Sequence, residues 1–194
     1  MKQIPHPKLN PYELNRKTTR LTDFNYACSH SYYVTLCTYQ RFCLFGEVQD
    51  AKMHNSPQGY IADVLLTEIP HHFPMVHILN YTIMPDHIHL LFYIDNETAD
   101  KAEIQRFQNL NRPTMKELRK KSIGKNSLSS IIKSYKSAVT FHCHRLNLEM
   151  KWQASFYDRV IRNTEEHEAF SLYITRNPQN WDEEREKTDG KWPI

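Results

Sequence analysis

The sequence predicts an α+β fold of the ferredoxin-like kind, in which helices pack on an antiparallel β-sheet. Segments with strand-like and helix-like patterns follow one another in the order β-α-β-β-α-β, and one further helix comes after them. Only a tight turn separates the two central strands, which is typical of an antiparallel pair. The length of 194 residues fits one domain. This fold is common, so it does not by itself indicate a function.

Four segments have the composition or alternation of strands. The first, SYYVTLCTYQ (31–40), is rich in β-branched and aromatic residues. Residues 76–83 and 87–94 form the central pair, and Met84-Pro85-Asp86-His87 supplies the turn between them, with proline setting φ at its second position. The fourth segment, ASFYDRVIR (154–162), alternates apolar and polar residues.

Two segments between these strands have the periodicity of helices. In 56–73, the apolar residues recur at helical spacing. In 127–146, Asn126 or Ser127 can cap the helix, and a single stripe carries most of the apolar side chains. Members of that stripe are Ile131, Ile132, Tyr135, Ala138, Val139 and His142.

A last helix should begin after the fourth strand. Asn163 and Glu166 have the spacing of a capping box. The helix should end near Asn177, because Pro178 disfavours helical geometry in the residue before it. The residues that follow, 179–194, are acidic and are expected to be loosely ordered.

The composition excludes several classes of protein. No stretch approaches the roughly 18 consecutive apolar residues of a membrane helix, and the N-terminus has no apolar signal core. The four cysteines show no CxxC pair or framework spacing, so we expect free thiols in a reducing cytoplasm.

The formal net charge of +3 hides an uneven distribution along the chain. Residues 1–100 carry 7 Lys/Arg against 10 Asp/Glu, and residues 163–194 carry 4 against 8. Residues 101–162 carry 14 against 4, a net of +10. This block is either a solvated surface or a face that binds a polyanion, and the charge alone does not choose between them.

Two histidines, His87 and His89, stand one residue apart at the start of the 87–94 strand. Side chains of a strand alternate between its faces, so both imidazoles point to one face and can bind one cation together. The opposite face carries an apolar row suited to the core: Ile88, Leu90, Phe92 and Ile94. Chance gives roughly 0.6 His-x-His pairs for 11 histidines in this length, so the spacing alone leaves a structural role open.

A second pair with the same spacing, His142-Cys143-His144, provides an internal control. It lies in the predicted 127–146 helix, where residues two apart point in different directions. We therefore expect only the strand pair to bind a metal ion.

The string MPDHIHLL, around the strand pair, resembles the motif of the single-tyrosine HUH transposases. The segment WQASFYDRVIRNTEEHEAFSLYITRNPQNW (152–181) is similar to the C-terminal signature of the REP-associated tyrosine transposase family, and SLSSIIKSYKSAVT (127–140) is similar to its middle helix. The resemblance covers about residues 31–181, which would be the transposase domain. An N-terminal arm (1–30) would precede it and an acidic tail (182–194) would follow it.

The resemblance implies an enzyme that cleaves and rejoins single-stranded, hairpin-forming DNA through a 5′-phosphotyrosine, as a monomer or homodimer. His87 and His89 would be metal ligands, Tyr173 the nucleophile and Asn177 the third protein ligand. Tyr173 and Asn177 are four residues apart, so they lie on one helix face. Mg²⁺ or Mn²⁺ suits a site that must also hold phosphate. The main rival nucleophile, Tyr135, lies on an apolar stripe that favours a core role.

Basic and aromatic residues supply the expected DNA contacts. Basic side chains would contact phosphates, and aromatic rings would stack on unpaired bases. The candidates are Lys133, Lys136, Arg145, Trp152, Tyr157, Arg159 and Arg162, together with Arg119, Lys120 and Lys121 in the 95–126 segment, which is longer than the family pattern.

Two alternatives remain open from the sequence. One is a domesticated nucleic-acid-binding protein of the same fold that lacks strand transfer. The other is a ferredoxin-like protein with a structural zinc, which would need neither Tyr173 nor Asn177.

Overall fold

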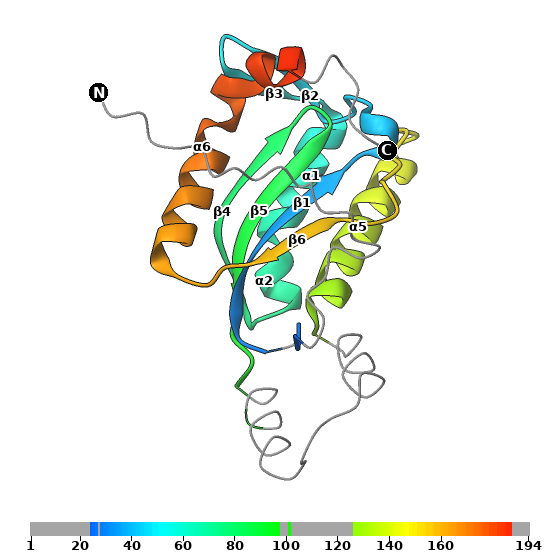
Figure 1. The fold of residues 1–194 in the computed structure, drawn as a ribbon. Coiled ribbons are helices and arrows are strands. Elements are labelled where there is room, and N and C mark those ends of the chain that lie inside the picture. Colours follow the sequence, from blue (N-terminus) through cyan, green and yellow to red (C-terminus); the bar gives the residue numbers. More distant parts are fainter. Residues whose placement is uncertain (1–23, 27, 98–100, 102–125, 188–194) are drawn as a thin grey trace, which may run out of the picture.

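The structure is a computed structural model that describes residues 24–26, 28–97, 101 and 126–187 (Figure 1). Its main sheet has four strands: β1 (His30–Cys37), β4 (Val76–Met84), β5 (His87–Ile94) and β6 (Tyr157–Val160). Their order in the sheet is β4-β5-β1-β6, and all neighbours are antiparallel. This order is that of a ferredoxin-like sheet, so the predicted fold class is confirmed.

Helices cover the two faces of this sheet unequally. One face carries α1 (Pro57–Thr67), the short α2 (Ile69–His72) and α5 (Leu128–Arg145). The other face carries α6 (Thr164–Lys187), which lies along the β4 side of the sheet (Figure 1). Most of the contacts of α6 with the sheet are with β4, and its first turns also reach Tyr33 of β1.

The main core lies between the sheet and the α1–α5 layer. The predicted apolar row of β5 faces this core, and each of its side chains is fully buried. Burial of one such side chain contributes about 1.5–3 kcal/mol. These buried residues are Ile88, Leu90, Phe92 and Ile94. A smaller cluster on the other face packs β1 and β5 against α6; its buried members are Tyr33, Leu91, Ile161, Phe170 and Ile174.

Helices α1 and α5 begin close to their predicted positions. The Ser127 hydroxyl accepts a hydrogen bond from Ser130 N at 3.4 Å, so the predicted cap of α5 is confirmed. The predicted 56–73 helix is divided at Glu68, two residues before Pro70, into α1 and α2. No helix among the described residues combines the length and the apolar character needed to cross a membrane.

Sequence patterns did not predict the hairpin formed by β2 (Gly46–Gln49) and β3 (Lys52–Asn55). Its turn residues, Asp50 and Ala51, have φ angles of 48° and 58°. A two-residue turn with two positive φ angles usually has the sequence Asn-Gly or Asp-Gly, from which a hairpin can be predicted. This turn has alanine at its second position, so the sequence does not predict it.

The predicted end of the last helix near Asn177 is wrong, because α6 continues through Pro178 to Lys187. A proline inside a helix costs about 3 kcal/mol. Burial of the large Trp181 side chain, which is 5 % exposed, offsets this cost. The expectation of a loosely ordered tail from residue 179 is therefore also wrong as far as Lys187. The start of the helix is confirmed: the Asn163 side chain accepts from Glu166 N at 2.8 Å.

Candidate active site

The two histidines of β5 lie side by side on the sheet face that α6 covers. His87 pairs with Cys37 of β1, and His89 pairs with Thr35. Both imidazoles are buried, at 3 % and 4 % exposure, and their ring centroids are 4.4 Å apart. The predicted common orientation of the strand pair is confirmed.

Each imidazole has one nitrogen held by the protein and one directed at its neighbour. The Nδ1 atom of His87 is 2.6 Å from Asp86 Oδ1. The Nδ1 atom of His89 is 2.7 Å from the Tyr33 hydroxyl and 3.0 Å from Thr35 Oγ1. The two Nε2 atoms face each other at 2.9 Å. Outer hydrogen bonds of this kind fix the orientation of metal-binding imidazoles.

The protonation state of the two imidazoles suits the binding of a cation by their Nε2 atoms. A carboxylate only accepts hydrogen bonds, so Nδ1 of His87 donates to Asp86 and its Nε2 keeps a lone pair. Burial lowers the pKa of His87 and lowers the pKa of His89 well below its usual range. Both rings are therefore neutral near pH 7, which is the form that binds metals. Two neutral Nε2 atoms at 2.9 Å share a proton in a hydrogen bond, and an ion that replaced this proton would lie to one side of the line that joins them.

Arg41 and Asp86, which the sequence analysis did not single out, connect the turn to His87. Arg41 Nε forms an ion pair with Asp86 Oδ2 at 2.9 Å, and its Nη1 is 2.8 Å from Cys37 Sγ. The Asp86 carbonyl accepts from the backbone and the hydroxyl of Thr38, both at 3.0 Å. The carboxylate of the MPDH string was visible in the sequence, but nothing local linked it to an arginine 45 positions earlier.

Three residues follow at intervals of four on α6, and the two aromatic ones lie beside the histidine pair. The ring of Tyr173 is 5.2 Å from that of His89, edge to face, and the ring of Trp181 is 6.0 Å from that of His87. Asn177 lies between them on the helix and is 1 % exposed. Neither polar atom of its amide has a hydrogen-bond partner among the described residues. A buried amide without a partner costs about 1–3 kcal/mol, which a ligand would recover.

The residues present fit a metal ion that takes nitrogen and amide-oxygen ligands. The Nε2 atoms of His87 and His89 could both bind an ion once it displaces the proton that they share, and Asn177 offers an otherwise unsatisfied oxygen. The described part of the chain holds no group of three or more His, Cys, Asp or Glu side chains that could bind a metal. A structural zinc, which takes four Cys or His ligands, therefore does not fit these residues.

Asn80 fastens α6 to the sheet at the level of Tyr173. Its amide nitrogen donates to the Ser171 carbonyl at 3.0 Å, the Ser171 hydroxyl at 2.9 Å and the Thr175 hydroxyl at 3.1 Å. Asn80 follows an irregularity in β4 where the pairing register with β5 shifts. Sequence patterns contain no signal for this contact, which fixes the tyrosine helix to the sheet of its own chain.

The rival tyrosine, Tyr135, lies in the core on the opposite side of the sheet. Its hydroxyl donates to the Ala62 carbonyl at 2.8 Å, and it is 3 % exposed. Burial raises its pKa well above the usual range. The predicted core role of Tyr135 is confirmed.

The predicted DNA contacts divide between the two sides of the sheet. Tyr157 and Arg159 pair with Thr35 and Tyr33 on the histidine side, and Arg159 forms an ion pair with Glu166 at 2.6 Å. Arg162 is exposed just before α6. On the other side, α5 carries Lys133, Lys136 and Arg145, and Trp152 packs beside it. Arg119, Lys120 and Lys121 lie outside the described residues.

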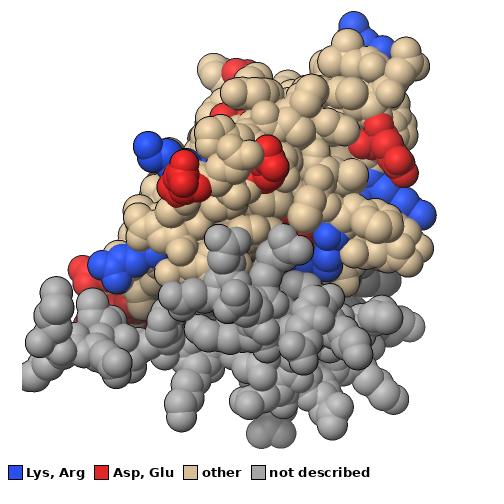
Figure 2. Space-filling model, turned by 90° about the horizontal axis from the view of Figure 1, so that it is seen from above, with Lys and Arg blue, Asp and Glu red and all other residues tan. Residues whose placement is uncertain are grey.

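Charged side chains do not form a patch of one sign on the face shown in Figure 2, where Lys and Arg are interspersed with Asp and Glu. The net +10 of residues 101–162 includes residues 102–125, which lie outside the described part of the chain. The existence of a basic DNA-binding face therefore stays a prediction.

Comparisons with known proteins agree with the fold. A solved structure of the REP-associated tyrosine transposase bound to a REP hairpin matches with a TM-score of 0.53 and 18% identity, covering 80% of this chain and 70% of that chain. The resemblance identified in the sequence is thus confirmed at the level of the fold. A candidate transposase from Deinococcus radiodurans matches at a TM-score of 0.40 and 13% identity, covering 78% of this chain and 93% of that one, which is too low to support an argument.

One sequence relative carries no stated function. It is an uncharacterized protein of Haemophilus influenzae, 27% identical over 173 residues, which are 88% of this chain and 92% of the relative. No protein-family model matches the chain.

Proposed function

We propose that this chain is a member of the REP-associated tyrosine transposase family that cleaves and rejoins single-stranded, hairpin-forming DNA. One observation carries the proposal: the Tyr173 ring of α6 lies against the ring of His89, which is paired with His87, and one helical turn further on the buried Asn177 amide has no partner among the described residues. A phenol beside two neutral imidazoles, with an amide on the same helix face, is what a tyrosine-based, metal-assisted phosphoryl transfer requires. A protein of the same fold is solved with a REP hairpin bound.

Tyr173 acts as the nucleophile in this proposal. Its phenolic oxygen attacks the scissile phosphorus, and the bond from phosphorus to the 3′-oxygen breaks. The departing strand takes a proton on its 3′-oxygen, and the phenol loses one. A 5′-phosphotyrosine remains, so the phosphodiester energy is conserved and a second 3′-hydroxyl can reverse the step to rejoin DNA.

His87, His89 and Asn177 would hold Mg²⁺ or Mn²⁺. When bound, the ion supplies Lewis-acid stabilisation of charge on the phosphate oxygens. Asp86 holds His87, and the Tyr33 and Thr35 hydroxyls hold His89, so that both Nε2 atoms keep their direction. Trp181 covers His87, and this apolar ring limits the access of water to the imidazole.

The proposal is tested by trapping the covalent complex. Wild-type protein, incubated with labelled single-stranded hairpin DNA and Mn²⁺, should give a protein–DNA adduct that survives denaturation. Tyr173→Phe removes one oxygen and little volume, so the adduct should disappear while folding and DNA binding persist. Tyr135→Phe should keep the adduct, because that hydroxyl bonds the Ala62 carbonyl in the core.

Peptide mapping of the trapped adduct supplies the decisive measurement. DNA attached to any tyrosine other than Tyr173 would place the active site elsewhere. Hairpin binding by the wild type without any adduct would favour the second function, a nucleic-acid-binding protein that lacks strand transfer.

A further inference from the structure

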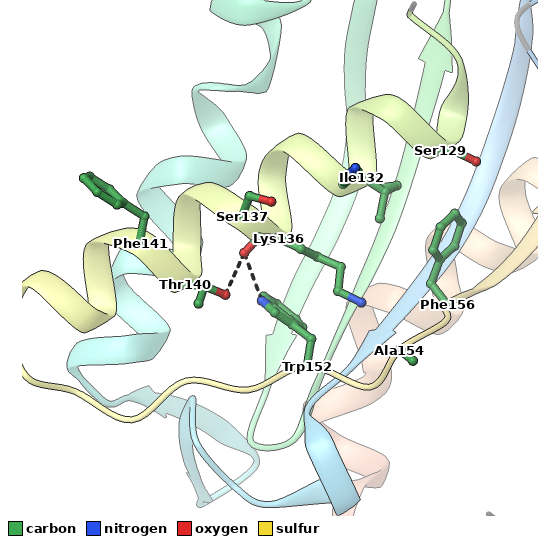
Figure 3. Close-up of a pocket in the computed structure, with 10 residues that line it drawn as sticks. Ser129, Ile132, Lys136, Ser137, Thr140, Phe141, Trp152, Ala154 and Phe156 are labelled. Atoms are coloured by element: carbon green, nitrogen blue, oxygen red, sulfur yellow. Dashed lines mark hydrogen bonds between the residues drawn. The ribbon is translucent and has the colours of Figure 1, made fainter. Parts of the chain in front are cut away.

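A groove runs along α5 on the side of the sheet away from the histidines. It has a volume of about 650 Å³ and lies between α5 and the segment that leads into β6 (Figure 3). Its size is within the range of about 300–1,000 Å³ found for ligand sites. We call it the α5 groove, and its lining consists of Ser129, Ile132, Lys133, Lys136, Ser137, Thr140, Phe141, Trp152, Ala154 and Phe156.

The α5 groove combines aromatic walls with positive charge. Lys136 extends into the space between the Trp152 and Phe156 side chains (Figure 3), with its Nζ atom 5.5 Å from the Trp152 ring centre. Lys133 is exposed at the same wall. Three hydroxyl side chains and no carboxylate line the described groove. Hydroxyl and ammonium groups bind phosphate oxygens. Because the charged side chains of the lining are all positive, the groove attracts negatively charged ligands.

The walls are rigid enough to act as a preformed site. The indole nitrogen of Trp152 donates to the Lys136 carbonyl at 3.1 Å, and the indole also packs on Phe45, with ring centroids 5.4 Å apart. Lys136 Nζ donates to the Gln153 carbonyl at 2.7 Å. An ammonium group has three N–H donors, so two others remain for a ligand.

The segment that supplies Trp152, Ala154 and Phe156 to the groove is also bonded to β1, the strand beside the histidines. Gln153 N donates to the Cys37 carbonyl at 2.9 Å, and Cys37 is the cross-strand neighbour of His87. Neighbouring strands are about 4.8 Å apart, so the Gln153 backbone lies about 10 Å from that of His87.

We propose that the α5 groove binds an unpaired stretch of the DNA strand, with bases stacked on Phe156 and Trp152 and phosphates on Lys133 and Lys136. This inference rests on the proposed function, and it assigns the groove to an unpaired part of the strand away from the cleaved phosphate, because the groove and the histidines lie on opposite faces of the sheet. A protein partner is less well matched, since the aromatic rings alternate with cations rather than forming a continuous apolar surface. Such alternation is typical of sites for single-stranded nucleic acid.

Binding is tested without cleavage, in the Tyr173→Phe background, with a fluorescent oligothymidylate of about eight nucleotides. Phe156→Leu keeps an apolar side chain but removes the stacking face, and should weaken binding about five-fold or more. Lys133→Gln should weaken binding and reduce the slope of log K against log salt by about one. The matched controls, Tyr60→Leu and Lys52→Gln, change an exposed aromatic and an exposed lysine outside the groove and should bind like the parent protein.

Photo-cross-linking locates the strand directly and separates this inference from the proposed function. An oligothymidylate carrying 5-iodouracil should cross-link to the peptide that contains 152–156. Parental affinity in both groove variants, with cross-links only outside this peptide, would overturn the inference even if the Tyr173 adduct forms. Cross-linking to 152–156 together with the loss of affinity would support it even if no adduct is ever trapped.

Discussion

The molecule has two His-x-His motifs with the same spacing, and the imidazoles converge in only one of them. On strand β5, His87 and His89 direct their Nε2 atoms at one point, 2.9 Å apart. On helix α5, His142 contacts the neighbouring Phe141 ring at 5.4 Å, and His144 is exposed to solvent. A strand returns to the same face every second residue, whereas a helix rotates by about 200° over two residues.

The surroundings of the two pairs differ as much as their geometry. The strand pair has a carboxylate and two hydroxyls on its Nδ1 atoms, and α6 brings Tyr173 beside it. Helix α5 also carries a tyrosine, Tyr135, but that hydroxyl is bonded inside the core. Histidines with the spacing of metal ligands therefore form a candidate site only where neighbouring elements orient their imidazoles and contribute further residues.

The largest effect is expected from removing the strand pair. The double variant His87→Ala, His89→Ala should lose Mn²⁺-dependent DNA cleavage by about a thousand-fold or more, because several kcal/mol of charge stabilisation disappear with the ion. Mn²⁺ should raise the thermal midpoint of the wild type and leave that of the variant unchanged, because only the native site binds the ion.

The matched control is His142→Ala, His144→Ala on α5, which should keep both cleavage and the Mn²⁺ effect. Circular dichroism of both double variants checks that the fold survives. Equal loss of activity in the two proteins would remove the distinction between the strand and helix pairs.

A smaller effect is expected from the carboxylate that only the strand pair possesses. Asp86→Asn keeps an acceptor for His87 Nδ1 but removes the charge that pairs with Arg41. Loss of such an outer partner typically costs 10–100-fold in metal affinity, so the Kd for Mn²⁺ in calorimetry should rise by about that factor. Asp63→Asn is the control, because Asp63 bonds the Tyr81 hydroxyl at 2.9 Å, away from the histidines. Unchanged Mn²⁺ affinity in Asp86→Asn would mean that the negative charge of Asp86 does not contribute to metal binding by His87.

Replacing Asn177 with an apolar residue should raise the stability of the metal-free protein and weaken its binding of metal. Its buried amide has no partner among the described residues, so Asn177→Leu, of similar volume, should stabilise the metal-free protein by about 1–2 kcal/mol. The same variant should bind Mn²⁺ more weakly, since an oxygen ligand is lost. Urea unfolding in the presence of a chelator measures the first effect, and calorimetry measures the second. A variant that is both less stable and equally tight for Mn²⁺ would show that Asn177 is a packing residue only.

The smallest effect concerns the start of α6, which positions Tyr173 over the strand pair. Burial raises the pKa of Glu166, but hydrogen bonds from the Arg159 side chain and the Arg162 backbone outweigh it, so the pKa is lowered from 4.5. A lowered pKa means that the unfolded chain binds the proton more readily, so the stabilisation is present above about pH 4.5 and is lost as the pH falls through the folded value.

Glu166→Gln should therefore reduce the free energy of unfolding by about 1 kcal/mol at pH 7 and have almost no effect in acid below that folded value. Thermal unfolding across this pH range measures the difference. Glu165→Gln, at an exposed neighbouring position, is the control. A difference that stays constant down to the acid limit would contradict the ion pair with Arg159.

Local chemistry determined much of this protein from the sequence alone. The alternation of β5 placed Ile88 in the core and His87 on the opposite face, because neighbouring side chains of a strand must point apart. The caps at Ser127 and Asn163 were also predictable, since a side-chain oxygen satisfies nearby backbone N–H groups. Tyr173 and Asn177 were identified as site residues because MPDHIHLL and YITRNP resemble the motifs of one family. Periodicity alone would have indicated that Tyr173 is a packed helix residue.

Only the tertiary structure decided the features that depend on contacts between distant segments. Helix α6 passes Pro178, against the local preference, because Trp181 gains burial beside His87. Arg41 reaches Asp86, and Asn80 fastens the helix at Ser171, across 45 and 91 positions of the chain. Propensities and spacings describe a residue's immediate neighbours, whereas these contacts arise when the sheet brings β1, β4 and β5 together, so no local pattern records them.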